Sequence, residues 1–398
     1  MVSVLLLAAW WSGDAFSQQT AEANGKFVVE TVGGEAFSGT GVQKSGGKIV
    51  LAGDAAREFE IDEVVGIETG AAETKASDKG QKILFVTGGG LRGVVDSVSA
   101  SSLEFVFGDS PVSIGLEAIA GVVWTDSQDV QNLLNNPSAE ADRVVVEGAS
   151  GSVIVSGLFE GMNTTQLSIQ YQGQSRSVDR AKIQAILPAR ISVPTKQDVA
   201  ATVTMSDGQS FRGKVFAMDS ESVTVSVMQQ EIKLPVDAVS TIAFASDRIL
   251  RLTELEPVSV SEEVMFAPAR EWKRNKSVSG NPIRLNDGSG DGSGKSYGNG
   301  LGMQARTQMI FANEKQFDRF AALVGIDLET EGRGDCLVSV RGDGIVLWSA
   351  RLQGGQPALP VNIDIAGMKQ IELLVELGEQ FDLSDHVDWA DARFLRTR

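Results

Sequence analysis

Apolar and polar residues alternate along much of the first 250 positions. The pattern is clear in Leu103-x-Phe105-x-Phe107 and again in Val223-x-Val225-x-Val227. A period of two places one face of a strand inward and the other toward water. Glycine-containing turns such as Ser206-Asp207-Gly208 separate these segments, since glycine adopts the positive φ that tight turns need. The pattern therefore predicts many short, half-buried β-strands.

The strand pattern is repeated. Setting Gly93 against Gly213 gives an offset of 213 − 93 = 120, and the next 30 residues align without a gap. A third copy starts at Gly157, and a looser fourth copy at Gly39 fits with a one-residue deletion. Each copy ends in a pattern that predicts strand, one helical turn and strand. Four or five short strands in about 50 residues predict a small closed barrel, similar to SH3-like and Sm-like barrels, because closure removes exposed edges.

The repeats set the expected domain boundaries. We expect a signal peptide at 1–17, β repeats at 26–70, 81–126, 142–190 and 198–247, a helical linker at 127–141 and a last unit at 252–396. The linker helix should stop at Asn136-Pro137. No repeat column carries a recurring acid, base or nucleophile, so the repeats are interpreted as a spacer or an array for protein partners. RNA binding, which some Sm-like barrels perform, is the alternative.

The amino-terminal segment indicates export. Val2 to Trp11 form an apolar run too short to span a bilayer, and Ala15 and Ser17 stand at −3 and −1 before a possible cleavage at Gln18. No Lys or Arg precedes the run, which leaves open a true start further upstream or a buried strand. No later stretch has 18 uninterrupted apolar residues, so we expect no transmembrane segment.

Composition excludes several classes of function. The formal charge is 35 − 52 = −17 and the pI is near 4.6, which argues against a nucleic-acid partner because phosphates are neutralised by clustered Lys and Arg. One cysteine and one histidine cannot form a Cys/His zinc cage or an intrachain disulfide. A Ser-His-Asp triad would have to use His386, since the chain has no other histidine.

After Asp247 the alternation gives way to separate motifs. In order, they are Tyr297-Gly-Asn-Gly-Leu-Gly-Met-Gln304, Phe317-x-x-Phe320 before Val324-Gly-Ile-Asp327, Val338-x-Val340-x-Gly-Asp-Gly344, and Asp385-His-Val-Asp-Trp-Ala-Asp-Ala392. Together they resemble the NPCBM family of carbohydrate-binding modules over about residues 252 to 396. The resemblance implies a jelly-roll β-sandwich that often accompanies glycoside hydrolases and binds sugars, in some members with a structural calcium ion. The whole chain is then all-β: four tandem small barrels followed by the sandwich.

Candidate glycan contacts follow from the chemistry of sugars, which stack on aromatic rings and hydrogen-bond to amides and carboxylates. The aromatic candidates are Trp272 and Tyr297, and the resemblance adds Asn299 and Gln304 from the turn of its first motif. Two of them depart from the family pattern: Asn299 replaces the usual Lys and Gln304 the usual His. If this turn contacts ligand, sugar binding is altered or lost.

The carboxylates near the chain end suggest a metal site. Asp385, Asp388 and Asp391 offer the hard oxygen donors that Ca²⁺ prefers. A structural cluster in which His386 and Asp388 hold Trp389 in the core is the favoured alternative, and direct sugar contact is a third.

These observations predict a binding protein rather than an enzyme. About 230 residues in repeats and about 145 in the module leave no room for a separate catalytic domain. We expect an exported protein that tethers itself to a glycan or polysaccharide. A structural or protein-interaction scaffold whose module no longer binds sugar is the alternative from another class, and a glycosidase with a degenerate catalytic part is a third.

Overall fold

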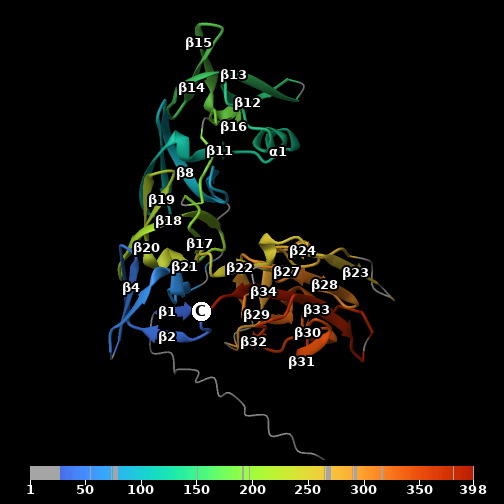
Figure 1. The fold of residues 1–398 in the computed structure, drawn as a ribbon. Helices are drawn as coiled ribbons and strands as arrows, with labels where there is room; N and C mark the ends of the chain where they lie inside the picture. The colour runs from blue at the N-terminus through green and yellow to red at the C-terminus, as the bar shows by residue number, and fades with distance from the viewer. Residues whose placement is uncertain are drawn as a thin grey trace, which may run out of the picture.

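The computed structural model describes residues 27–397 except 54, 73, 75–78, 150, 191, 197, 264, 266–269, 289, 291–293, 315–316 and 380. The predicted signal peptide at 1–17 lies outside the described residues. Regular structure in this part of the chain is almost entirely β, which confirms the all-β prediction. Four repeat units extend away from a sandwich that lies beside units 1 and 4 (Figure 1). None of the described helices has the length and apolar character needed to cross a membrane.

The four repeat units share one order of elements, except that the long second strand of units 2, 3 and 4 is divided into β2 and β3 in unit 1. Unit 1 contains β1 (Phe27–Thr31), β2 (Ala36–Gly39), β3 (Gly41–Ser45), β4 (Lys48–Ala52), β5 (Arg57–Glu60), η1 (Ile61–Glu63) and β6 (Val64–Glu68). Unit 2 contains β7 (Gln81–Phe85), β8 (Gly90–Ser99), β9 (Ser102–Phe107), β10 (Ser110–Gly115), η2 (Leu116–Ala118) and β11 (Ile119–Val123). Unit 3 contains β12 (Asp142–Gly148), β13 (Gly151–Met162), β14 (Gln166–Tyr171), β15 (Gln174–Asp179), η3 (Arg180–Lys182) and β16 (Ile183–Leu187). Unit 4 contains β17 (Ala201–Met205), β18 (Ser210–Met218), β19 (Ser222–Val227), β20 (Gln230–Pro235), η4 (Val236–Ala238) and β21 (Val239–Phe244).

The units join in pairs through their edge strands. In every unit the last strand pairs with the first, and it also pairs with the last strand of another unit: β6 with β21, and β11 with β16. Units 1 and 4 thus share an 11-stranded sheet, and units 2 and 3 a 10-stranded one. The finer expectation of four separate closed barrels is not confirmed. An unpaired edge strand exposes backbone hydrogen-bonding groups, and pairing between units removes that exposure.

The glycine at the start of each repeat alignment is required for the same steric reason in all four units. A Cβ on Gly93 would lie 2.6 Å from Phe105 Cδ2, and one on Gly213 would lie 2.6 Å from Val225 Cγ1. The equivalent pairs in units 1 and 3 are Gly39 with Leu51 and Gly157 with Ile169. In all four units a bent strand crosses closely over its neighbour, and only glycine leaves the space for that crossing.

A single helix, α1 (Gln128–Asn135), connects units 2 and 3. Ser127 caps it, because its Oγ accepts a hydrogen bond from the backbone N–H of Val130 at 3.3 Å. The helix ends just before Asn136-Pro137, within the segment expected to be helical. Val130 is fully buried against the strands that the two units share.

The last third of the chain is a two-sheet sandwich. One sheet has the order β24-β27-β34-β29-β32 with β22 beside β34, and the other has the order β23-β28-β33-β30-β31. The first sheet consists of β22 (Ile249–Arg251), β24 (Lys273–Arg274), β27 (Gly300–Gln304), β29 (Arg319–Ile326), β32 (Leu359–Asp364) and β34 (His386–Leu395). The second sheet consists of β23 (Ser259–Glu262), β28 (Thr307–Ala312), β30 (Asp335–Gly342), β31 (Ile345–Gln353) and β33 (Gln370–Leu377). The remaining elements are η5 (Leu252–Glu254), η6 (Leu328–Thr330) and the small pair β25 (Ile283–Leu285) and β26 (Lys295–Tyr297).

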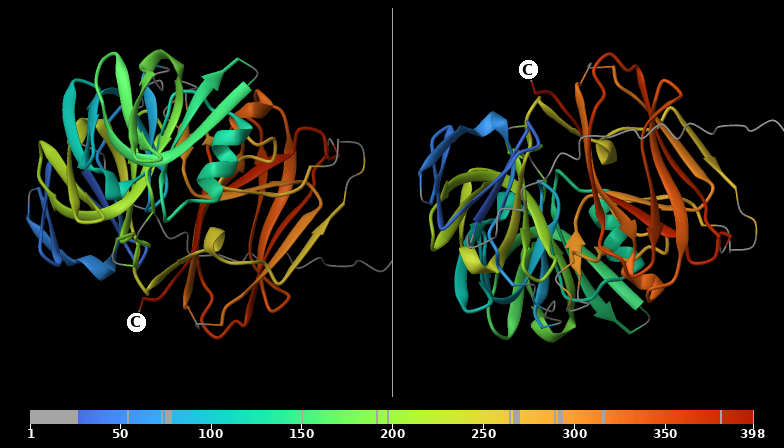
Figure 2. Two further views of the ribbon diagram at one scale, coloured as in Figure 1. Left: turned by 90° about the horizontal axis from the view of Figure 1, so that it is seen from above. Right: turned by 90° about the horizontal axis from the view of Figure 1, so that it is seen from below.

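The sandwich has its own apolar core between the two sheets. Trp389 is fully buried there, with Phe320 and Trp348 packed at ring-centroid distances of 6.4 Å. The two parts of the molecule also contact one another, as Figure 2 shows from above and below. Five buried apolar residues join them, namely Val32 and Val65 of unit 1 with Ile249, Ala321 and Leu395.

Candidate functional site

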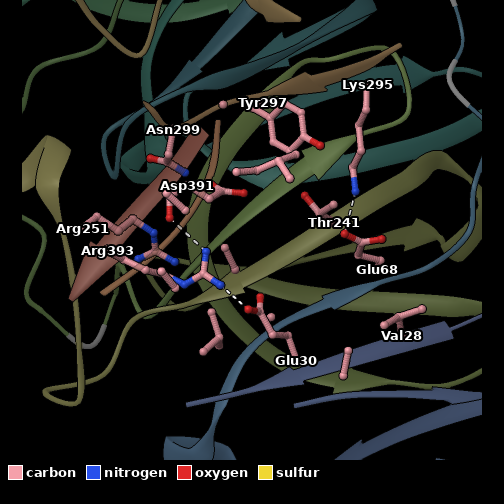
Figure 3. Close-up of a pocket in the computed structure, with 18 of the residues that line it drawn as sticks. Val28, Glu30, Glu68, Thr241, Arg251, Lys295, Tyr297, Asn299, Asp391 and Arg393 are labelled. Atoms are coloured by element: carbon pink, nitrogen blue, oxygen red, sulfur yellow. Dashed lines mark hydrogen bonds and ion pairs between the residues drawn. The ribbon is translucent and has the colours of Figure 1, made fainter. Parts of the chain in front are cut away.

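A pocket of about 340 Å³ lies where the repeats meet the sandwich (Figure 3). One wall is the outer face of β1, β6, β21 and β17, from units 1 and 4. The other wall comes from β26 and the residues after it, together with β29, β32 and β34 of the sandwich. The pocket is therefore built from segments far apart in the sequence.

The repeat wall is a regular row of outward-facing side chains. Val28 pairs with Glu68, Glu68 with Thr241, and Thr241 with Thr204, each on an adjacent strand. All four residues line the pocket. Because side chains alternate along a strand, the residues beside them in sequence, such as Ile242, point into the core of the repeats. The same alternation that builds the repeat core thus presents this row to the sandwich.

The sandwich wall presents Tyr297, Asn299 and Asp391, as Figure 3 shows. Asp391 stands at a register shift between β29 and β34 and has φ 49°, a left-handed conformation found at β-bulges. Its backbone N–H donates to the carbonyl oxygen of Asn299 at 3.0 Å, which fixes the Asn299 turn against β34. The next residue, Gly300, must be glycine, because a Cβ would lie 2.8 Å from the carbonyl oxygen of Trp389.

Charges of both signs surround the pocket and largely neutralise one another. Its charged lining consists of Arg251, Lys295, Arg393, Glu30, Glu68 and Asp391. Lys295 Nζ lies 2.6 Å from Glu68 Oε1, and Arg393 forms an ion pair with Glu30. Burial lowers the pKa of Arg251, and the nearby charges of Asp391 and Glu254 oppose that shift.

Several polar side chains on the pocket walls make no hydrogen bond within the described part of the chain. The side chains of Thr204, Thr241, Asn299 and Asp391 make no hydrogen bond to any described residue. They come from both walls, two from each. Two hydroxyls, an amide and a carboxylate provide donors and acceptors that a bound polar molecule can use.

The other two predicted glycan contacts lie outside this pocket. Gln304 is buried in β27 opposite His386, with 4% of its surface exposed. Trp272 is half-buried against the sandwich core, and the guanidinium carbon of Arg274 lies 5.4 Å from its ring centroid. The structure thus brings Tyr297 and Asn299 together and separates them from Trp272 and Gln304.

Asp385 lies close to two other carboxylates, Asp335 at the start of β30 and Asp382. It is fully buried, and its Oδ1 accepts a hydrogen bond from the backbone N–H of Asp335 at 2.7 Å. Burial raises the pKa of Asp385 to about 7, with the charges of Asp335 and Asp382 acting in the same direction. Asp335 itself is paired with Arg351, whose Nη2 lies 2.6 Å from Asp335 Oδ2.

Asp388 and His386 lie in a second polar cluster, next to η6. Asp388 is fully buried, and burial together with the facing carboxyl of Asp327 raises its pKa well above the usual range. A protonated Asp388 can donate to Asp327. His386 Nδ1 lies 2.7 Å from Glu329 Oε1, and the neighbouring Trp389 is in the core. Asp385, Asp388 and Asp391 therefore have three different environments, and in the described ranges no three His, Cys, Asp or Glu side chains are grouped to hold a metal ion.

The class of this sandwich is shown by comparison with known proteins. Residues 250–395 match the NPCBM/NEW2 domain, so the prediction of an NPCBM module in the last third of the chain is confirmed. This is a carbohydrate-binding module family.

Particular relatives are similar over parts of the chain. A protein of Renibacterium salmoninarum named "Putative endo-alpha-N-acetylgalactosaminidase" is 31% identical over 103 residues, which are 26% of this chain and 7% of that protein. The chain thus spans a small fraction of this curated relative's length. A CBM51 from Clostridium perfringens GH95, solved in complex with methyl-galactose, is 26% identical with a TM-score of 0.34 and covers 37% of this chain and 99% of its own. The tandem CBM51 modules of a family 98 glycoside hydrolase from Streptococcus pneumoniae are 14% identical with a TM-score of 0.33, covering 94% of this chain and 89% of theirs.

The sequence alone indicated the sandwich side of the pocket but missed the repeat side. Thr204, Thr241 and Glu68 belong to no motif, and a period of two predicts only that such outward positions face water. Their only signal is the alternation itself, which is the same for a strand that faces water and one that faces a second domain.

Proposed function

We propose that the chain is an exported, non-catalytic glycan-binding protein that recognises sugar at the pocket beside Tyr297. The observation that carries the proposal is that Tyr297 and Asn299, predicted separately as sugar contacts, line one pocket with Asp391. An aromatic ring beside an amide and a carboxylate is the mixture of groups that selective sugar sites use. The NPCBM/NEW2 match supports the same conclusion.

The carboxylates around the pocket favour binding over hydrolysis. Glycoside hydrolysis usually needs two carboxylates across the scissile bond, one of them with a raised pKa. Glu30 and Glu68 on the pocket wall are each paired with a cation. Among the described residues, the aspartates with a raised pKa are Asp385 and Asp388, which are buried and do not line the pocket. These positions support passive recognition, in which the chain tethers itself to a glycan.

Export is proposed on the amino-terminal pattern. The apolar run from Val2 to Trp11, followed by Ala15 and Ser17, fits cleavage before Gln18. Mass spectrometry of the mature chain from a secreting bacterial host should give Gln18 as the first residue. A cell-retained chain that keeps its first 17 residues would contradict export.

A protein-interaction scaffold is the second candidate, because the repeats expose large apolar side chains. Val94 is 54% exposed, Leu158 62% and Phe216 58%, all on strands of units 2, 3 and 4. Exposed apolar groups of this size mark interaction surfaces when they are contiguous. This candidate requires no ligand in the pocket.

A glycan array probed with the full chain separates the two candidates. Binding should be reproducible and should weaken in Asn299→Ala, because that variant removes an unpartnered amide from the pocket. A parallel array with a chelator tests the proposed calcium ion, whose removal would weaken binding if it supports the fold. A blank array under both conditions would favour the scaffold. Turnover of chromogenic glycosides by the purified chain would point to the degenerate glycosidase instead.

A further inference from the structure

We propose that the outer face of units 1 and 4 is the second wall of the glycan site, so that an uncharged sugar is held between repeats and module. This inference rests on the function proposed above and deepens it. It gives the repeats a direct part in recognition, in addition to a role as spacer or interaction array.

The first argument is the position of the repeat residues. Glu68, Thr241 and Thr204 form a row across three adjacent strands, and all three line the same pocket as Tyr297 and Asn299. Figure 3 shows Glu68 and Thr241 on this wall. A ligand that reaches the Asn299 amide inside a pocket of about 340 Å³ therefore lies close to this row as well. That volume is near the lower end of the range for small-molecule pockets, about 300–1,000 Å³, which suits one or two sugar rings.

The second argument is that unpartnered polar groups are divided between the two walls. Thr204 and Thr241 contribute hydroxyls from the repeats, while Asn299 and Asp391 contribute an amide and a carboxylate from the module. A sugar ring presents hydroxyls around its whole circumference, so it can use donors and acceptors on both sides at once. An aliphatic or aromatic ligand would leave these groups without partners at a cost.

The third argument concerns charge. The lining has three cationic and three anionic side chains, and Glu68 and Glu30 are already paired with Lys295 and Arg393. The third cation, Arg251, lies 3.9 Å from Glu254 and near the Asp391 carboxylate. A phosphate or a uronic acid would have to compete with these carboxylates for a cation, and it would also face Asp391. The balance of charge therefore selects neutral sugars over acidic ones.

The second wall is held in place without a ligand. The ion pairs to Lys295 and Arg393 cross between the repeats and the module on either side of the pocket. Beside them, Val65 and Ala321 belong to the buried apolar cluster that joins the two parts. The Asn362 side-chain amide of β32 lies against Gly34 of unit 1, where a Cβ would collide with it. Binding then costs little ordering of the walls, since the site is preformed.

The test uses the full chain, titrated by calorimetry with galactose, N-acetylgalactosamine, glucose and N-acetylglucosamine, with their disaccharides, and with galacturonic and glucuronic acids. The double variant Thr204→Val/Thr241→Val removes both hydroxyls and keeps the side-chain shape. It should raise the Kd of the bound neutral sugar about tenfold, the factor expected for losing two neutral hydrogen bonds. Thr204→Ser/Thr241→Ser keeps the hydroxyls and should restore binding.

Thr202→Val is the matched control. Thr202 is also half-buried on β17, two residues from Thr204, but it does not line the pocket, so its Kd should be unchanged. Neutral sugars should bind at least tenfold more tightly than the uronic acids. Thermal melts confirm that each variant is folded.

The outcomes separate this inference from the function on which it rests. If the unaltered chain binds no sugar, the proposed function fails and the inference with it. If the unaltered chain binds, but the double valine variant has the same Kd as Thr202→Val, the inference alone is overturned: the sugar is then held by the module residues of the pocket, and Asn299→Ala still weakens binding. Preference for a uronic acid would overturn the assignment to neutral sugars.

Discussion

Lys295 of the module and Glu68 of the first repeat form an ion pair of 2.6 Å between residues 227 positions apart. The pair lies at the pocket and joins the two walls (Figure 3). Glu68 is paired in turn with Thr241 across the sheet of units 1 and 4. The repeats and the module are thereby linked at the same place where unpartnered polar groups gather.

The two ion pairs across the interface should differ in their effect on stability. Glu68→Gln should lower the free energy of unfolding by at most about 1 kcal/mol, because the Glu68 side chain is 54% exposed and water replaces the pair. Glu30→Gln should cost more, about 1–3 kcal/mol, because it leaves the Arg393 guanidinium without its charged partner in a side chain only 9% exposed. Urea unfolding measures both variants, and equal losses would contradict this account of the interface.

The repeat glycines should not tolerate a methyl group. In Gly213→Ala the added Cβ would lie 2.6 Å from Val225 Cγ1 and 2.8 Å from the carbonyl oxygen of Ser226. We expect a loss of about 1–3 kcal/mol, the usual cost of overpacking. Gly47→Ala is the control, since a Cβ there meets no atom within 4 Å. Thermal unfolding that is unchanged in Gly213→Ala would show that the crossing strands can separate.

Stability should depend on pH through Asp385. Its pKa is raised to about 7 in the folded chain, whereas the pKa of an unfolded Asp is about 3.9. Between these pH values the folded state holds more protons than the unfolded state, so stability falls as pH rises from about 4 to about 7 and then levels off. Asp385→Asn mimics the protonated form at every pH. The free energy of unfolding of the variant minus that of the unaltered chain should therefore be larger at pH 8 than at pH 4.

The control for that series is Asp109→Asn, on an exposed turn. Its melting temperature should follow that of the unaltered chain at every pH. If Asp385→Asn also runs parallel to the unaltered chain from pH 4 to pH 8, the raised pKa is wrong.

The thiol of Cys336 should not react with alkylating reagents in the folded protein. Its side chain is fully buried, and burial together with the charges of Asp385 and Asp335 raises the pKa of the thiol well above its usual value. Thiolate is the reactive form, so alkylation should require unfolding. Intact-mass analysis after iodoacetamide treatment should show no adduct in buffer and one adduct in denaturant, because the chain has one cysteine. Rapid labelling in buffer would mean that β30 opens readily.

The strands of the repeats could be predicted from periodicity, and the NPCBM module could be predicted from the order of its motifs. The offset between Gly93 and Gly213 located two equivalent strands because the same steric contact recurs at the same spacing. The order of motifs from Tyr297 to Ala392 located the NPCBM module, which the family match confirms.

Pairings between distant units could not be derived from the sequence. Ile67 and Ile242 lie opposite each other on β6 and β21. The sequence pattern predicts only that each points into the core of its own repeat. Edge pairing between units depends on backbone groups that are the same in every strand. For the same reason Thr241 gave no indication that it faces a second domain.

Two of the four predicted sugar contacts lie in the pocket and two do not, and the difference depends on tertiary packing. Tyr297 and Asn299 lie together because the bulge at Asp391 fixes their turn. Trp272, predicted as a sugar contact, is covered by the guanidinium of Arg274, and its indole packs partly on the core. Gln304 ends strand β27, all of whose residues are buried, so its side chain does not reach the pocket.

The most direct measurement is a calorimetric titration of the full chain and of Asp391→Asn with the neutral sugar that the glycan array selects. Asparagine tolerates the left-handed backbone of Asp391, so this variant removes the carboxylate charge and keeps the bulge. We predict saturable binding by the unaltered chain and a Kd at least tenfold higher in Asp391→Asn. Equal affinity in the two proteins would place the sugar outside the pocket and contradict the account.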